Sequence, residues 1–207
     1  MKQDLLNLVK EVEQDIKPIF DEVESTCQIN SSKVLNAFQR CNLQETHLTS
    51  STGYGIDEPG RNKIEEIYSE VFKAEDSLVR TQLISGTHAL AVTLSALLRP
   101  NDTMLSITGE PYDTLKTVIG IGKEESKSSL KSYNIKYEQI DLVDNDFDIK
   151  KIQERLSKKD VKLVEIQRSR GYSTRKSLTI EKIEKVIKAI REVIVMENLY
   201  KIENLSR

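Results

Sequence analysis

One stretch decides the fold of this chain: Leu83-Ile84-Ser85-Gly86-Thr87-His88-Ala89-Leu90. An apolar run ends in Ser-Gly-Thr, and an apolar, helix-like run from Ala89 to Leu98 follows at once. This order predicts a strand, a tight glycine turn and a helix N-terminus. Backbone N–H groups and the positive end of the helix dipole converge at such a turn, so we expect an anion there. On its own, however, the turn is more often an ordinary connection with a Ser or Thr cap.

Short β-branched runs and helical patterns alternate from Ser77 onward. The predicted strands are Leu78 to Ile84, Thr103 to Ile107, Ile135 to Ile140, Val161 to Ile166 and Val193 to Met196. The predicted helices are His88 to Leu98, Thr114 to Ile119, Ile149 to Leu156 and Ile180 to Ile190. This alternation predicts an α/β fold with a mostly parallel sheet flanked by helices. Ligands of such sheets bind at the carboxyl ends of the strands.

The first 60 residues have a different pattern. Apolar side chains recur at helical spacing from Leu5 to Phe20, and Pro18 is expected to kink or end that helix. The run Asn30-Ser31-Ser32 then predicts the cap of a second helix. A loop rich in glycine and proline, residues 50–60, leads to another helix from Ile64 to Phe72. We therefore expect residues 1–60 to form a helical arm with an interface loop, and residues 61–207 to form the α/β domain.

Composition excludes several classes of function. The chain has 31 Lys and Arg against 33 Asp and Glu, a balance that gives no support to nucleic-acid binding. The charged start lacks the apolar core of a signal peptide, and no stretch reaches membrane-spanning length. The two cysteines, Cys27 and Cys41, lack metal-like spacing and are expected to be free thiols. We expect a cytoplasmic protein with no membrane, nucleic acid or metal partner.

Two further groups follow predicted strands at the same edge of the sheet. Tyr112, in Gly109-Glu110-Pro111-Tyr112-Asp113-Thr114, can stack on an aromatic ligand, and it is equally typical of a surface aromatic that covers a helix start. Arg168 and Arg170, in Gln167-Arg168-Ser169-Arg170-Gly171-Tyr172-Ser173, can clamp a carboxylate or phosphate. For the arginines we rank a small anion first, solvated loop charge close behind, and nucleic acid last.

Together these pieces resemble the methionine gamma-lyase-like family of aluminium resistance proteins, which are pyridoxal-phosphate enzymes of the aspartate-aminotransferase fold. The resemblance extends from about Phe20 to Leu178 and is specific, because many short matches occur in one order. The matching segments are residues 33–38 (KVLNAF), 52–55 (TGYG), 60–61 (GR), 74–80 (AEDSLVR), 85–89 (SGTHA), 98–100 (LRP), 111–115 (PYDTL), 118–120 (VIG) and 167–172 (QRSRGY).

The resemblance implies a role for each matching position. Ser85, Gly86 and Thr87 would hold the phosphate of pyridoxal 5'-phosphate, and Tyr112 would stack on its pyridine ring. Residues Gln167 to Arg170 would lie near the ring oxygen and the substrate, with Gln167 on the cofactor and Arg168 and Arg170 on the amino-acid carboxylate. The remaining two cofactor residues, Tyr54 and Arg61, would reach a neighbouring subunit's phosphate in a homo-oligomer. The resemblance also implies the large domain of a fold type I transferase.

The sequence departs from the family in two places. The loop after Gly55 has Ile56-Asp57-Glu58-Pro59 where the family has an aromatic residue and paired aspartates. The family's Asp-Asn-Cys-Tyr-Gly-Glu strand end is replaced by a run in which Glu197 is the one acid able to pair with the pyridine nitrogen. The family's Schiff-base lysine lies on a later strand, and Lys201 comes too early to replace it.

These departures predict an incomplete domain that lacks its C-terminal half. Two strands that lie next to the first strand in this fold would be missing, and the first strand would be left unpaired. The leading hypothesis is thus an N-terminal fragment that resembles a carbon–sulfur lyase and is inactive alone, with no catalytic residue of its own. The alternative is a non-catalytic module that pairs with a full-length homologue or a complementary fragment. An RNA-binding domain that uses Arg168 to Lys176 ranks last.

Overall fold

The computed structural model describes residues 2–122, 126–194 and 200–203. The chain forms two compact units, Met1–Leu83 and Ile84–Arg207. The boundary that we expected between residues 60 and 61 falls inside a helix of the first unit, so that unit extends to residue 83.

The first unit is helical. It contains α1 (Lys2–Arg40), the 3-10 helix η1 (Glu45–Leu48) and α2 (Pro59–Phe72). Its small core joins the end of α1 to α2 through Ala37, Cys41 and Ile67, with Phe38, Leu43 and Val71 packed against them. Most of α1 therefore makes no core contact, and apolar side chains such as Leu5, Val12 and Ile19 are exposed.

Two predictions for this region were wrong, because α1 is one helix of 39 residues. Pro18 lies inside it and does not end it, since a proline removes one backbone hydrogen bond and the turns on either side retain theirs. The ion pair between Lys17 and Asp21 at 2.9 Å spans this point. The predicted cap at Asn30-Ser31-Ser32 is helical as well, and Ser31 Oγ lies 3.9 Å from Cys27 Sγ of the preceding turn.

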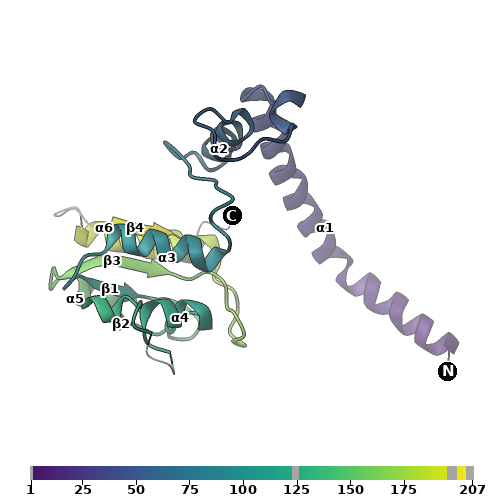
Figure 1. Cartoon of the computed structure of the whole chain (residues 1–207). Coiled ribbons are helices and arrows are strands. Elements are labelled where there is room, and N and C mark those ends of the chain that lie inside the picture. The colour runs from purple at the N-terminus through teal and green to yellow at the C-terminus, as the bar shows by residue number, and fades with distance from the viewer. Residues whose placement is uncertain (1, 123–125, 195–199, 204–207) are drawn as a thin grey trace. The chain divides into compact units, whose positions relative to one another are not determined.

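The second unit is the α/β part of the chain. It contains α3 (Gly86–Leu97), β1 (Thr103–Ser106), α4 (Asp113–Ile119), η2 (Lys131–Tyr133), β2 (Lys136–Gln139), α5 (Ile149–Leu156), β3 (Val161–Ile166), α6 (Ile180–Ile194) and β4 (Tyr200–Glu203). The described strands lie in the order β2-β1-β3-β4, and every pair is parallel. Figure 1 shows these strands side by side with helices around them. The predicted parallel α/β sheet flanked by helices is confirmed.

Side chains alternate between two cores on the two faces of this sheet. Leu105 belongs to the core that contains Ile152 of α5 and Val186 of α6. Its neighbour Met104 belongs to the other core, which contains Leu94 of α3 and Leu115 of α4. Because successive side chains of a strand point to opposite faces, β1 and β3 each contribute to both cores. These two strands are buried on both sides, as parallel strands usually are, whereas β2 is only partly buried.

The predicted strand Leu78 to Ile84 is absent from the described sheet. This segment instead binds α2 through Glu65: Val79 N–H donates to Glu65 Oε1 at 2.9 Å, and Arg80 forms an ion pair with the same carboxylate. Ser77 Oγ donates to Glu65 O at 2.6 Å. A strand needs a neighbouring strand for its backbone hydrogen bonds, and the described sheet offers none to this segment.

The predicted strand Val193 to Met196 was also wrong where it can be examined. Val193 and Ile194 form the end of α6, and the rest of the predicted strand lies outside the described residues. Ile183, Ile187 and Val193 pack on the same core, so the helical spacing of apolar residues continues past the predicted end at Ile190. The edge strand β4 comes later, at Tyr200–Glu203.

The packing of α5 generates a stability prediction. Ile152 is fully buried against α6, so Ile152→Ala should lower the free energy of unfolding by about 2–5 kcal/mol. Urea unfolding followed by circular dichroism measures this. Lys150→Ala on the same helix is the matched control, because that side chain is 89% exposed, and it should change stability by less than about 0.5 kcal/mol. Equal effects of the two substitutions would contradict the assigned core.

Candidate functional site

The N-terminus of α3 presents free backbone donors to open space. Ser85 is the N-cap in extended conformation, and its Oγ accepts from His88 N–H at 3.1 Å. The first N–H groups of a helix have no partner within it, so those of Gly86 and Thr87 remain available. A Cβ built on Gly86 would have no atom within 4 Å, so the space in front of the turn is open. The donors and the open space suit a phosphate group.

Hydroxyl groups extend this turn toward α4. Thr87 Oγ1 lies 2.9 Å from Tyr112 Oη and 2.7 Å from Thr114 Oγ1. Tyr112 is the N-cap residue of α4, and its ring packs beside the core of α3 and α4. The structure therefore brings Tyr112 to the Ser-Gly-Thr turn, although the strand predicted before that turn is absent from the described sheet. Thr114, which the sequence analysis placed only as a helix start, completes the cluster.

Gln167 connects the end of β3 to the same cluster. Its Oε1 accepts from Tyr112 N–H at 3.0 Å, and its Nε2 donates to Ser169 O at 2.9 Å. Its own N–H donates to Thr108 Oγ1 at 3.0 Å. With 5% exposure, the Gln167 side chain is held between the loops that follow β1 and β3. Through the hydrogen bond to the Tyr112 N–H, Gln167 holds the backbone of Tyr112 in place.

The arginines after β3 lie on one loop. Arg168 is half-buried, and its Nε donates to Leu178 O at 3.4 Å. Arg170 is exposed, and its Nη1 donates to Arg175 O at 3.4 Å. Both therefore extend from the segment that also carries Gln167, at the carboxyl end of the strand.

Arg175 organises this loop and was missed as a site residue. Its Nη2 donates to three consecutive carbonyl groups, those of Gln167 at 3.2 Å, Arg168 at 3.5 Å and Ser169 at 2.8 Å. Burial, with a smaller effect of nearby Arg170, lowers the pKa of Arg175 from its ordinary value. The sequence did contain a signal for Arg175. It is the third arginine of an Arg-x-Arg-x4-Arg run, and a two-point clamp on an anion needs fewer than three arginines.

Tyr54 and Arg61 lie in the first unit. The loop that contains Tyr54 wraps around buried Glu58, whose Oε1 accepts from Gly55 N–H at 2.8 Å and from Thr52 Oγ1 at 3.1 Å. Hydrogen bonds from the Ser51 hydroxyl and the Gly55 amide lower the pKa of Glu58. Arg61 closes the loop by donating to Gly55 O at 3.1 Å and Ile56 O at 3.0 Å. Tyr54 itself is 85% exposed.

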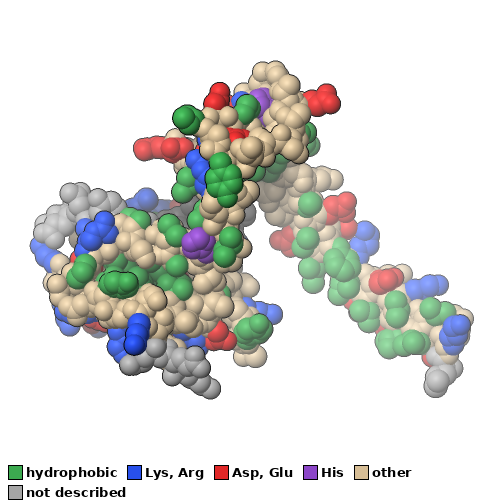
Figure 2. Space-filling view, viewed as in Figure 1, with side chains coloured by type: hydrophobic (Ala, Val, Ile, Leu, Met, Phe, Trp, Pro, Cys, Tyr) green, Lys and Arg blue, Asp and Glu red, His purple; other side chains and the backbone are tan. Residues whose placement is uncertain are grey.

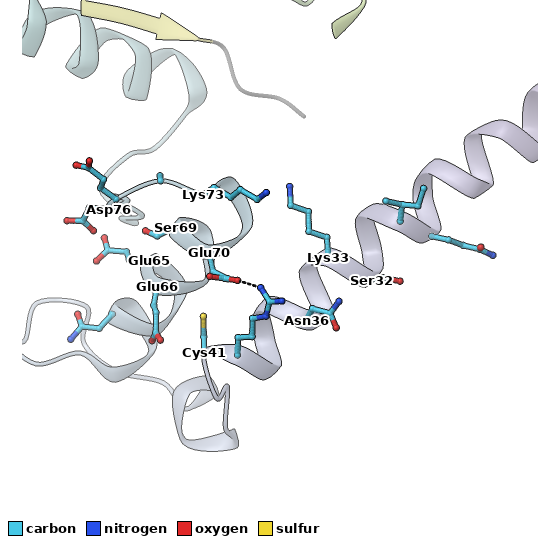
Figure 3. Close-up of a pocket in the computed structure, with 16 residues that line it drawn as sticks. Ser32, Lys33, Asn36, Cys41, Glu65, Glu66, Ser69, Glu70, Lys73 and Asp76 are labelled. Carbon is cyan, nitrogen blue, oxygen red and sulfur yellow. Dashed lines mark hydrogen bonds and ion pairs between the residues drawn. The ribbon is translucent and has the colours of Figure 1, made fainter. Parts of the chain in front are cut away.

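A charged cavity between α1 and α2 contains none of the predicted site residues (Figure 3). Lys33 and Asn36 approach it from α1, and Glu65, Glu66 and Glu70 approach it from α2. An ion pair between Arg40 and Glu70 at 2.6 Å crosses from one helix to the other. Because this ion pair joins the two helices across the cavity, the cavity has the character of a polar helix contact.

Other kinds of site were also searched for. Among the described residues, no three His, Cys, Asp or Glu side chains are grouped as metal ligands. None of the helices in the described ranges is both long and apolar enough to cross a membrane. Cys27 is an exposed free thiol and Cys41 a buried one. Glu197 lies outside the described residues, and Lys201 belongs to β4.

The comparisons with known proteins identify the family. The model of the methionine gamma-lyase family matches residues 5–201. The chain belongs to the methionine gamma-lyase family. This confirms the resemblance that the short motifs indicated.

The chain is also similar to proteins of known structure. The chain is 41% identical to a candidate cystathionine beta-lyase involved in aluminum resistance from Clostridium acetobutylicum, with a TM-score of 0.89 over 96% of this chain and 47% of that one. It is 37% identical to a carbon-sulfur lyase involved in aluminum resistance from Clostridium novyi NT, with a TM-score of 0.88 and the same coverage. It is also 40% identical over 196 residues to the uncharacterized protein YnbB of Bacillus subtilis, covering 92% of this chain and 46% of YnbB. The chain thus spans about half the length of these relatives.

The role of Arg175 can be tested by proteolysis. Arg175→Lys keeps the positive charge but has one nitrogen in place of the guanidinium fork, so it cannot bond Lys176 O through one nitrogen and Ser169 O through another, and the loop should open more often. We expect trypsin to cleave after Arg168 and Arg170 several-fold faster, measured by mass spectrometry against time. Lys176→Arg, an exposed neighbour that retains a trypsin site, should leave these rates unchanged. Unchanged cleavage in Arg175→Lys would contradict the role.

The lowered pKa of Glu58 predicts a pH-dependent stability. Because its folded pKa lies below the ordinary 4.5, ionised Glu58 stabilises the fold above that pH, and this contribution is lost as pH falls through the folded pKa. Glu58→Gln should therefore be less stable than the native chain at neutral pH, with a difference that shrinks in acid. Denaturant unfolding at neutral and at acidic pH measures this difference in stability. Glu75→Gln, at an exposed position, is the control. A pH-independent difference would contradict the assignment.

Proposed function

We propose that this chain supplies the phosphate-holding and ring-stacking part of a pyridoxal 5'-phosphate site in a carbon–sulfur lyase that acts on an amino acid. The sheet would then be part of the large domain of a fold type I enzyme. The observation that supports this most directly is the 2.9 Å contact between Thr87 Oγ1 and Tyr112 Oη, which joins the anion-binding turn to an aromatic side chain. Family membership supports the choice of cofactor.

Each residue has a task that its contacts allow. The N–H groups of Gly86 and Thr87 and the hydroxyl of Ser85 bind the phosphate, with the α3 dipole adding favourable potential. Thr87, which is itself bonded to Thr114, holds the Tyr112 hydroxyl, so the ring has one orientation in which to stack on the pyridine. When bound, the cofactor supplies an electron sink for reaction at the substrate's α-carbon.

The loop after β3 faces the substrate in this proposal. Gln167 holds the Tyr112 backbone from behind, and its remaining Nε2 hydrogen is available to the cofactor's ring oxygen. Arg168 and Arg170 orient the substrate carboxylate by charge and hydrogen bonding. Arg175 holds the backbone carbonyl groups of this loop. It thereby fixes the backbone positions from which the side chains of Arg168 and Arg170 extend. Tyr54 and Arg61 are proposed to reach the phosphate of a neighbouring subunit.

Ligand binding tests the proposal. Isothermal titration calorimetry should show that the chain binds pyridoxal 5'-phosphate more tightly than pyridoxal, because pyridoxal lacks the phosphate. Thr87→Val removes a hydroxyl beside the phosphate and should weaken binding about tenfold or more, the cost of a hydrogen bond to a charged group. Thr93→Val is the matched control, since Thr93 lies on the same helix and its Oγ1 donates to Ala89 O at 2.8 Å.

The contrary outcomes are distinct. Equal affinity for the two compounds, or equal effects of Thr87→Val and Thr93→Val, would place the ligand elsewhere. No binding by a chain whose circular dichroism shows the folded structure would reject the proposal.

One observation favours a second candidate, a binding module without catalysis. Exposed apolar side chains follow one another along α1, among them Leu5, Val9, Val12, Ile19 and Val23. Figure 2 shows hydrophobic groups along this helix. Sedimentation of the chain with and without a full-length homologue distinguishes the candidates: a module binds the homologue through α1, and Val12→Glu abolishes that binding without changing affinity for the cofactor.

A further inference from the structure

Glu165 is a buried acid in the middle of the parallel sheet. It lies in β3, is 6% exposed, and has Ser106 of β1 as its register partner on one side and Ile202 of β4 on the other. Its Oε1 is buried without a hydrogen-bond partner in the described structure. A charged carboxylate in such a place costs much more than a neutral carboxylic acid. The proposed function assigns this group no task.

The hydroxyl of Ser106 shows where a proton must be. Ser106 Oγ lies 2.7 Å from Glu165 Oε2 and 2.8 Å from Gly109 O, and both are hydrogen-bond distances. A serine hydroxyl has one hydrogen and can donate to only one of these oxygens. The Gly109 carbonyl has no hydrogen to give, so the other hydrogen must come from Glu165. The proton count is satisfied when Glu165 Oε2 donates to Ser106 Oγ, and Ser106 Oγ donates to Gly109 O.

The Gly109 turn is the segment that presents Tyr112. Gly109 has a φ of +81°, a conformation that glycine adopts without strain, and its N–H donates to Ile140 O at 3.0 Å. Three residues later, Tyr112 N–H donates to Gln167 Oε1. The turn is thus held at its carbonyl by Ser106 and at its far end by Gln167. Loss of either hold would free the loop that places Tyr112 beside Thr87.

We propose that Glu165 is a neutral carboxylic acid whose hydrogen, passed through Ser106, fixes the Gly109 turn and thereby positions Tyr112 for the cofactor. Glu165 is a positioning residue, because it acts through Ser106 and the turn. The effect of Glu165 on cofactor binding rests on the proposed function. The protonation state of Glu165 is independent of that function.

Among the side chains that the structure describes, Glu165 has no ion-pair partner. From β2, Tyr137 faces it, and burial, with a smaller effect of Glu165, raises the pKa of that tyrosine. On the helices over this face, α3 carries His88, and α4 carries Asp113 and Lys116, which pair with each other at 2.9 Å. Burial raises the pKa of Glu165, and the Ser106 hydrogen bond opposes that shift. Burial therefore favours the neutral form of Glu165.

Carbon-13 NMR of the protein labelled at the glutamate carboxyl carbons tests the protonation without any cofactor. The Glu165 signal is the one absent from Glu165→Gln. We expect it at the chemical shift of a neutral acid at neutral pH, where exposed Glu154, whose own signal Glu154→Gln identifies, has the shift of a carboxylate. A carboxylate shift for Glu165 at neutral pH would overturn the proposal.

Hydrogen exchange and cofactor binding test the positioning. Glu165→Gln retains an N–H that can donate to Ser106, so exchange of the Tyr112 amide and affinity for pyridoxal 5'-phosphate should match the native chain. Glu165→Ala leaves Ser106 without its donor and should speed that exchange and weaken affinity about tenfold. Glu165→Asp, which is too short to reach Ser106, serves instead if the alanine variant does not fold.

The outcomes separate the two proposals. If native chain fails to bind the cofactor, the proposed function fails, while the NMR shift and the Tyr112 exchange still decide the role of Glu165. If Glu165→Gln behaves like Glu165→Ala, or if neither changes the exchange of Tyr112, Glu165 does not position the turn.

Discussion

The parallel pairing of β1 with β3 is the constraint on which the rest of the second unit depends. Because the two strands run in the same direction, the loops that follow them emerge at one edge of the sheet. One loop brings Tyr112 and the other brings Gln167, and the hydrogen bond between Gln167 Oε1 and Tyr112 N–H closes the gap between them. The N-terminus of α3 meets this pair through the Thr87 hydroxyl. An antiparallel pair would place these groups at opposite ends of the sheet.

Much of the α/β unit could be predicted from the sequence, because the apolar patterns that specify its helices and strands lie within short segments of the chain. The runs Val161 to Ile166 and Ile149 to Leu156 have unambiguous apolar patterns, and the structure has those very elements. The placing of Tyr112 and Gln167 at one edge of the sheet followed from the direction of the parallel strands β1 and β3. The contact of Thr87 with Tyr112 did not follow in this way, because Leu78 to Ile84 is not a strand of the described sheet. The family was also evident from short motifs, because many of them occur in one order along the chain.

The failures have a different cause, because each depends on a partner that is distant in the sequence. Whether Leu78 to Ile84 forms a strand depends on a neighbouring strand, and Glu65 of α2 binds that segment instead. Pro18 was expected to kink or end its helix, and α1 does not end there, because a single lost hydrogen bond does not end a long helix. Arg175 and Glu165 were missed as well, since their importance lies in backbone carbonyls and in a hydroxyl that only the folded chain brings to them.

The central claim is that the N-terminus of α3 holds the phosphate of the cofactor, and amide NMR tests it most directly. A ¹H–¹⁵N titration with pyridoxal 5'-phosphate should move the Gly86 and Thr87 amide signals most, with Tyr112 following and the α5 and α6 amides unchanged. Titration with inorganic phosphate should move the same two amides and leave Tyr112 in place. If the cofactor binds and the largest shifts lie outside residues 85–87 and Tyr112, the account is contradicted.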